Sequence, residues 1–94
     1  MANKYKKLIN QIEKVILELD KRLVQEPDRK ILNTLFDRYT KANEILKSNG
    51  DINQIMIKGG FRAYLDSYSD YMNPLLAEID KAERLLKEIQ SRES

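Results

Sequence analysis

The sequence predicts an all-α protein, folded as a small antiparallel helical bundle that forms a single domain over residues 1–94. The first observation is that apolar residues recur at alternating steps of three and four, which places them on one face of an α-helix. The second is that the alternation of apolar and polar residues typical of a β-strand is absent. The third is that only three glycines and two prolines occur, and all but Pro74 lie between the periodic segments.

Three segments of the chain carry this helical spacing. The first contains Tyr5, Ile9, Ile12, Ile16, Leu19 and Leu23. The second contains Leu32, Leu35, Tyr39, Ala42 and Leu46. The third contains Phe61, Leu65, Tyr68, Met72, Leu75, Ile79, Ala82, Leu86 and Ile89. Further apolar residues beside each row widen the apolar faces beyond those of a two-stranded coiled coil, which favours a globular bundle.

We expect the first helix over residues 3–25 and the second over residues 28–48, each about 30 Å long. The tripeptide Glu26-Pro27-Asp28 separates them. Proline fits the first turn of a helix, and acidic residues favour its positively polarised N-terminus.

The second helix is expected to end at Asn49-Gly50, because these residue types tolerate the left-handed conformation that often follows a helix. Asp51 can then cap a short helical stretch near residues 51–58. Gly59-Gly60 stops or bends that stretch.

The third segment allows two interpretations, because its apolar spacing runs without a slip through Pro74. In the first, the chain reverses at Asn73-Pro74, where asparagine caps a separate fourth helix and proline occupies its first turn. In the second, one long helix bends at Pro74 and extends beyond its partners. The unbroken spacing favours the long, kinked helix, since a turn would usually reset the phase.

Composition excludes several kinds of chemistry. The chain has no cysteine and no histidine, so zinc and iron–sulfur sites lack their usual ligands, and Cys nucleophiles and Ser-His-Asp triads cannot form. Asp66 and Asp70 lie four residues apart, but two carboxylates are too few to hold a divalent metal ion. We therefore expect no metal site, no cofactor, no small-molecule substrate and no enzymatic activity.

Aromatic residues gather between residues 58 and 74, and three tyrosines there share one face of the predicted helix. Tyrosine supplies a large contact area with a polar tip and is enriched at protein interfaces. This pattern predicts an interaction patch made of Phe61, Arg62, Tyr64, Asp66, Tyr68, Asp70, Tyr71 and Met72. The alternative is that these tyrosines edge the core of their own bundle while their hydroxyl groups reach water.

The 17 basic and 15 acidic residues leave a net charge of +2, with the two signs interspersed. Four basic residues surround the start of the first helix: Lys4, Lys6, Lys7 and Lys14. They fit a helix that binds an anionic membrane surface or, less readily, nucleic acid, and they equally fit a solvated helix face. No uninterrupted apolar run exceeds three residues, which is too short for a signal peptide or a membrane span. We expect a cytoplasmic protein.

Together these patterns predict a non-enzymatic protein that acts through protein–protein interaction. The partner is expected to be a second copy, forming a homodimer through the helix over residues 61–89, or another helical protein. The alternative is peripheral binding to an anionic surface through the N-terminal lysines. In size, mild basicity and helical periodicity the chain resembles bacteriocin immunity proteins, a resemblance of shape and charge that matches no motif.

Overall fold

A computed structural model describes residues 5–67 and 73–93 of the chain. The elements in chain order are α1 (Lys6–Gln25), α2 (Lys30–Lys47), the 3₁₀ turn η1 (Ile52–Gln54), α3 (Gly60–Ser67) and α4 (Pro74–Glu93). Over these ranges the chain forms helices, turns and irregular segments but no strand, so the all-α prediction is confirmed.

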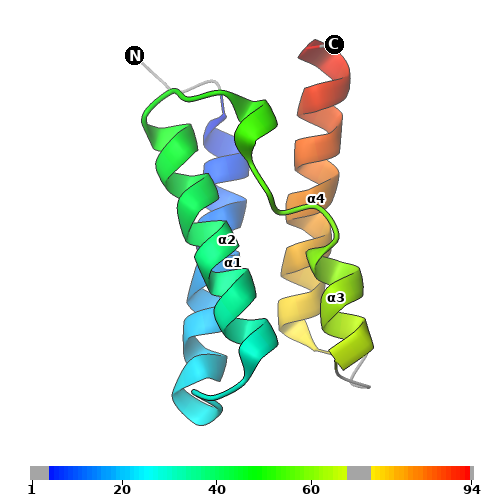
Figure 1. The fold of residues 1–94 in the computed structure, drawn as a ribbon. Helices are drawn as coiled ribbons and strands as arrows, with labels where there is room; N and C mark the ends of the chain where they lie inside the picture. Colours follow the sequence, from blue (N-terminus) through cyan, green and yellow to red (C-terminus); the bar gives the residue numbers. More distant parts are fainter. Residues whose placement is uncertain (1–4, 68–72, 94) are drawn as a thin grey trace.

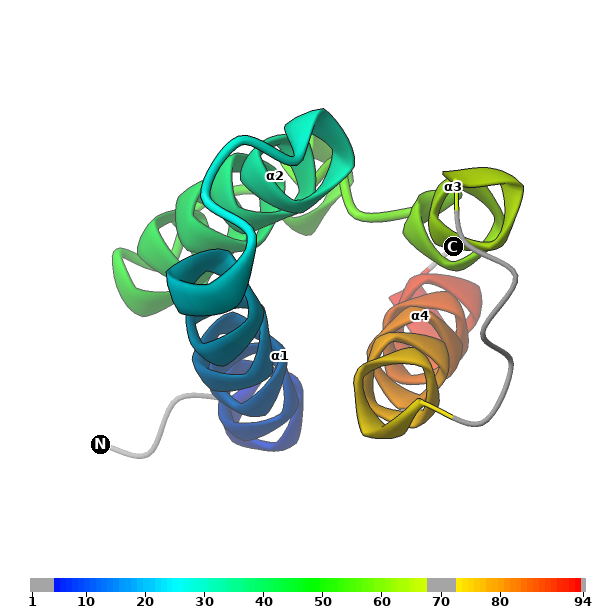
Figure 2. The same ribbon diagram turned by 90° about the horizontal axis from the view of Figure 1, so that it is seen from below.

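The helices form an antiparallel bundle in which α1 packs against both α2 and α4. Figure 1 shows α1 running toward one end of the molecule, and α2 and α4 running back in the opposite direction. The chain between α2 and α4 returns alongside them, with η1 at one end and α3 at the other. α3 packs against α4 and α2, and the view along the bundle in Figure 2 shows it beside α4.

The core lies between the helices and the segment that connects α2 to α3, and it is built from the predicted apolar faces. The buried apolar side chains are Tyr5, Leu8, Ile9, Ile12, Val15, Leu19, Leu32, Leu35, Tyr39, Ala42, Leu46, Ile52, Ile55, Ile57, Tyr64, Leu75, Leu76, Ile79, Ala82 and Leu86. Truncating an aliphatic core residue of this kind to alanine costs about 2–5 kcal/mol, because it leaves a cavity as well as losing buried surface.

The turn between α1 and α2 differs slightly from expectation. The second helix is predicted to begin at residue 28, just after Pro27, but α2 begins at Lys30. Pro27 instead lies in a tight turn, which the N–H of Arg29 closes by donating to the carbonyl of Glu26 at 3.2 Å. Proline suits the second position of such a turn for the same reason that it suits a helix start, because its φ angle is already fixed near the required value.

The end of α2 follows the prediction. Asn49 adopts a left-handed φ of 59°. The N–H of Gly50 donates to the carbonyl of Ile45, and the N–H of Asn49 donates to the carbonyl of Leu46. These two bonds form a Schellman motif, which satisfies carbonyl groups that the helix end would otherwise leave free.

The predicted short helix over residues 51–58 is only partly present. Asp51 does act as a cap, accepting a hydrogen bond from the N–H of Asn53 at 2.9 Å, but η1 is a single 3₁₀ turn. The chain then becomes extended, with Ile55 and Ile57 buried and Met56 between them exposed. This alternation explains the correction, since an extended segment can bury every second residue and still cover the gap between α2 and α4.

The favoured interpretation of one kinked helix over residues 61–89 is wrong. α3 ends at Ser67, and α4 begins at Pro74 and runs in the opposite direction (Figure 1). Asn73 caps α4, because its Oδ1 accepts a hydrogen bond from the N–H of Leu75 at 2.9 Å. The apolar spacing stays in step across Pro74 although α3 and α4 are separate helices, so continuity of phase does not require continuity of helix.

Candidate functional site

The predicted interaction patch is divided by the structure. Tyr64 is fully buried in the monomer, and its hydroxyl oxygen accepts a hydrogen bond from Nδ2 of Asn73 at 2.6 Å. Phe61 is half-buried against the core, and only Arg62 and Asp66 are exposed. The remaining members, Tyr68, Asp70, Tyr71 and Met72, lie outside the described residues. Tyr64 therefore serves the core, which corrects its placement on an exposed patch.

The start of α3 is fixed by a side chain of α4. The carboxylate of Glu83 accepts hydrogen bonds from the N–H of Gly59 at 3.1 Å and from the N–H of Phe61 at 2.8 Å. Gly60 lies so close to Leu35 that a Cβ atom there would come within 3.0 Å of its side chain. Glu83 thus supplies the negative charge that the N-terminus of α3 favours.

A shallow hollow of about 370 Å³ is lined by Glu83 and three basic residues, Lys58, Arg84 and Lys87. The carboxylate of Glu83 already accepts hydrogen bonds from the α3 backbone. Arg84 pairs with Asp80 at 3.0 Å. Within this hollow Glu83 links α4 to the start of α3, whereas the pair of Arg84 with Asp80 lies within α4 itself.

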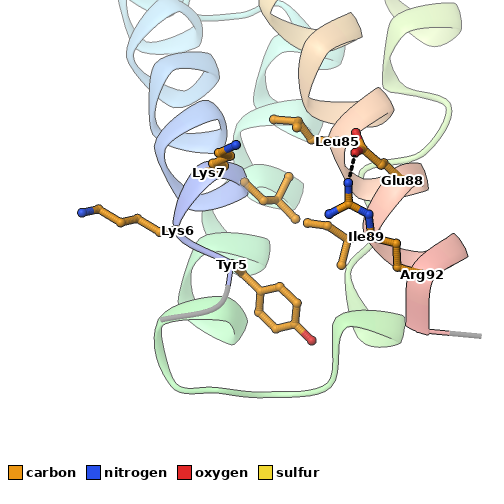
Figure 3. Close-up of a pocket in the computed structure, with 8 residues that line it drawn as sticks. Tyr5, Lys6, Lys7, Leu85, Glu88, Ile89 and Arg92 are labelled. Carbon is orange, nitrogen blue, oxygen red and sulfur yellow. Dashed lines mark hydrogen bonds and ion pairs between the residues drawn. The ribbon is translucent and has the colours of Figure 1, made fainter. Parts of the chain in front are cut away.

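The predicted basic set lies at the surface wherever it is described. Lys6, Lys7 and Lys14 are exposed, and Lys4 lies outside the described residues. Lys6 and Lys7 line a pocket of about 330 Å³ between the start of α1 and the end of α4. Figure 3 shows Lys6 pointing away from this pocket, whose walls are largely apolar and whose far rim carries the ion pair between Glu88 and Arg92.

An exposed apolar surface on α1 was not predicted from the sequence. Three large apolar side chains are exposed in the part of the chain that the structure describes, and two of them are on this helix. Leu17 is 57% exposed and Val24 is 78% exposed, whereas the third, Met56, lies in the extended segment before α3. Leu17 and Val24 are seven residues apart, so they lie on the same face of α1, two turns from each other.

Asn10 is exposed on the same face, one further heptad toward the N-terminus. We call Asn10, Leu17 and Val24 the α1 stripe. Beside it lies a hollow of about 310 Å³ between α1 and α2, lined by Glu13, Ile16, Leu17, Asp20, Phe36 and Asn43. Ile16 and Phe36 are half-buried there, which extends the apolar surface from Leu17 toward α2.

Charged residues flank the α1 stripe on both sides. With 100° between successive helical residues, Glu13 and Asp20 lie about 40–60° to one side of Leu17, and Lys14 and Lys21 lie equally far to the other. All four side chains are exposed. Glu13 also pairs with Lys47 of α2 at 2.9 Å, and its hydrogen bond to Lys47 lowers the pKa of its carboxyl group.

Two buried polar atoms lack a hydrogen-bond partner within the described ranges, the hydroxyl oxygen of Tyr39 and Oδ1 of Asn43. Burial, reinforced by the negative charge of Glu83, raises the pKa of Tyr39 above its ordinary value. Tyr39 is therefore held neutral inside the bundle.

Residues 5–67 and 73–93 contain no cluster of three or more acidic residues placed to hold a metal ion. Within the same ranges no helix combines the length and the apolar character needed to cross a bilayer.

A model of the family described as "YeeD uncharacterised protein" matches residues 2–93, almost the whole chain. The chain belongs to the YeeD family. A relative in that family, the uncharacterized protein YeeD of Bacillus subtilis strain 168, is 36% identical over 91 residues, which cover 88% of this chain and 89% of the relative. No solved structure matches the chain.

The match spans the YeeD family protein from α1 to α4, so the family corresponds to the whole bundle described above. The description of the family assigns no activity.

Proposed function

We propose that this protein is a non-enzymatic helical protein that works by associating with a second copy of itself. The outer face of α1 supplies the contact. The observation that carries this proposal is the exposure of Leu17 and Val24 on one helix face, beside the half-buried Ile16 and Phe36. The hollow between α1 and α2 joins Leu17 to Ile16 and Phe36, and exposed apolar patches mark protein–protein contact sites.

The segment over residues 61–89, which the sequence predicted as one self-associating helix, forms α3 and α4. Most of its described apolar side chains pack inside the monomer. Those of Tyr64, Leu75, Ile79 and Leu86 are fully buried. The described part of this apolar row therefore packs on its own chain, and α1 carries two of the three large apolar side chains that are exposed in the described residues.

Sedimentation velocity over a micromolar to millimolar concentration range tests the proposal. We expect a concentration-dependent shift from monomer to dimer, which Leu17→Lys weakens because it places a charge in the apolar contact. Met56→Lys is the matched control, since Met56 is 71% exposed and lies away from α1. A protein that stays monomeric over the whole range refutes the proposal, and equal effects of the two substitutions refute the role of α1.

A second candidate is binding to an anionic surface, such as a membrane or nucleic acid. It is favoured by the exposure of Lys7, Lys14 and Lys21 at seven-residue spacing along one flank of α1. This candidate requires retention on anionic vesicles or DNA at low salt, with steep loss as salt is raised. Absence of such retention excludes it and leaves self-association.

The proposal also includes a cytoplasmic location, which the cysteine-free composition supports.

A further inference from the structure

Building on the proposed self-association, we infer that two copies of this protein pair their α1 helices in parallel and in register across the α1 stripe. In this arrangement Leu17 meets Leu17 and Val24 meets Val24 of the other copy. The acidic flank of each α1 then faces the basic flank of the other.

The two flanks of the stripe carry opposite charges. Glu13 and Asp20 lie on one side of Leu17, and Lys14 and Lys21 lie on the other, each pair repeating after seven residues. The stripe therefore separates a negative edge from a positive edge along about two turns of helix. A surface divided in this way can be complementary to a copy of itself.

Helix direction decides which edges meet. When two helices pair in parallel, the two-fold axis runs along them and brings the edge on one side of the first helix against the opposite edge of the second. When they pair antiparallel, the axis is perpendicular to both helices and brings each edge against its own copy. Antiparallel pairing would thus oppose acid to acid and lysine to lysine, which is unfavourable, whereas parallel pairing opposes acid to lysine.

The register follows from the same residues. With Leu17 opposite Leu17, Asp20 and Lys21 of the other copy differ by one residue in their position along the helix axis. Glu13 and Lys14 of the other copy differ by the same amount. A one-residue offset is about 1.5 Å along the axis, well within the reach of these side chains. The two-fold axis repeats each pair, so four ion pairs surround the apolar centre.

The monomer leaves part of this charge unused. Asp20 and Lys14 form no ion pair with any other residue in the described ranges, and Lys21 has only a long contact of 3.4 Å to Glu18 on its own helix. Glu13 is already paired with Lys47, so Asp20 and Lys21 are the pair on which the arrangement most depends. A contact across one helix is small, and small interfaces are typical of weak or transient complexes.

Cysteine cross-linking tests the direction of the helices, because the chain has no cysteine of its own. Asn10→Cys and Val24→Cys are the two probes, and Met56→Cys is the control for random collision. Stripe residues facing each other in paired helices have Cα atoms about 5 Å apart, within the range of a disulfide bond. Parallel pairing predicts that each probe cross-links to itself under mild oxidation, faster than the control. Antiparallel pairing predicts cross-linking only when the two probes are mixed.

Charge reversal provides a test with opposite signs for the two arrangements. Asp20→Lys would place lysine opposite Lys21 in the parallel dimer, and we expect it to weaken dimerisation ~10-fold or more. In an antiparallel dimer the same change would place lysine opposite Glu13 and strengthen the contact. Lys21→Asp should also weaken the parallel dimer, and mixing the two variants should restore it, because each new charge then meets its opposite.

The outcomes separate this inference from the proposed function. Self-linking of both cysteine probes, with restoration by the mixed charge variants, supports the parallel arrangement. A dimer that cross-links only in the mixed sample, or that Asp20→Lys strengthens, overturns the parallel arrangement and leaves self-association in place. A dimer whose probes link no faster than the Met56→Cys control removes the α1 stripe from the interface. A monomer at every concentration overturns both.

Discussion

Within residues 5–67 and 73–93 two tyrosines, Tyr39 and Tyr64, are fully buried, and their hydroxyl groups differ in hydrogen bonding. The hydroxyl oxygen of Tyr64 accepts a hydrogen bond from Nδ2 of Asn73 at 2.6 Å. The hydroxyl oxygen of Tyr39 is buried with no hydrogen-bond partner among the described residues. Replacing each tyrosine by phenylalanine removes the hydroxyl and keeps the ring, so the two substitutions should change the free energy of unfolding differently.

The expected magnitudes follow from what each change leaves behind. Tyr64→Phe leaves the amide of Asn73, which is itself buried, without its acceptor. We expect it to lower the free energy of unfolding by about 1–3 kcal/mol, the cost of an unsatisfied buried polar group. Tyr39→Phe removes a buried hydroxyl that has no bond to lose, and we expect a change between zero and a gain of about 1 kcal/mol.

Urea unfolding followed by far-UV circular dichroism measures both changes. The dependence of the free energy on urea concentration should stay the same in the two variants, since neither alters the surface exposed on unfolding. Thermal unfolding gives a second reading, because about 1 kcal/mol shifts the midpoint of a domain this size by roughly 4–8 °C. Dilute samples avoid a contribution from dimerisation. A loss for Tyr39→Phe as large as that for Tyr64→Phe would refute the difference between the two hydroxyl groups.

Three further predictions concern the same bundle. Glu83→Ala should lower the free energy of unfolding by about 1–3 kcal/mol, since two backbone N–H groups lose their acceptor. The control Glu88→Ala removes an exposed ion pair worth about 0.5 kcal/mol or less. Similar losses for both would show that the cap contributes little. Because the folded-state pKa of Tyr39 is raised, the contribution of Tyr39 to stability is complete below its ordinary pKa of 10.0 and is lost as pH rises above that value. Tyr39→Phe should therefore flatten the alkaline decline in the free energy of unfolding. An unchanged dependence on pH would contradict this prediction. Gly59→Ala should cost about 1–2 kcal/mol, since Gly59 has a φ of +86° with open space around it, and a neutral result in thermal unfolding would contradict this backbone explanation.

The parts of the fold that follow from the sequence are those set by single residues or by local spacing. The apolar rows of the first two segments supply most of the buried positions of α1 and α2. Asn49 and Asp51 act at the element ends where their chemistry predicts them. These predictions succeed because helix periodicity and capping depend on neighbours within a few residues.

The reversal between α3 and α4 could not be read from periodicity, because the apolar rows of the two helices stay in step across the residues between them. Its local evidence was present in Asn73 and Pro74, which together form a helix start. Tyr64 shows a related limit. Its position beside the row of the third segment predicts a half-exposed side chain, but α3 is short and lies against α4, so the bundle encloses Tyr64 as well.

The α1 stripe was missed for a different reason, which bears on how interaction surfaces are found in small bundles. A core face has two apolar positions in every heptad, whereas the stripe has only one, at Leu17 and Val24, and so it disappears among the polar residues of a solvated face. The charges beside it are informative only when read as two edges, since Asp20 and Lys21 are adjacent in sequence and look like ordinary mixed surface charge. Once the fold places Leu17 away from the core, the same two residues lie on opposite sides of an exposed apolar line. That arrangement makes the surface of α1 complementary to a parallel copy of itself and repulsive toward an antiparallel one.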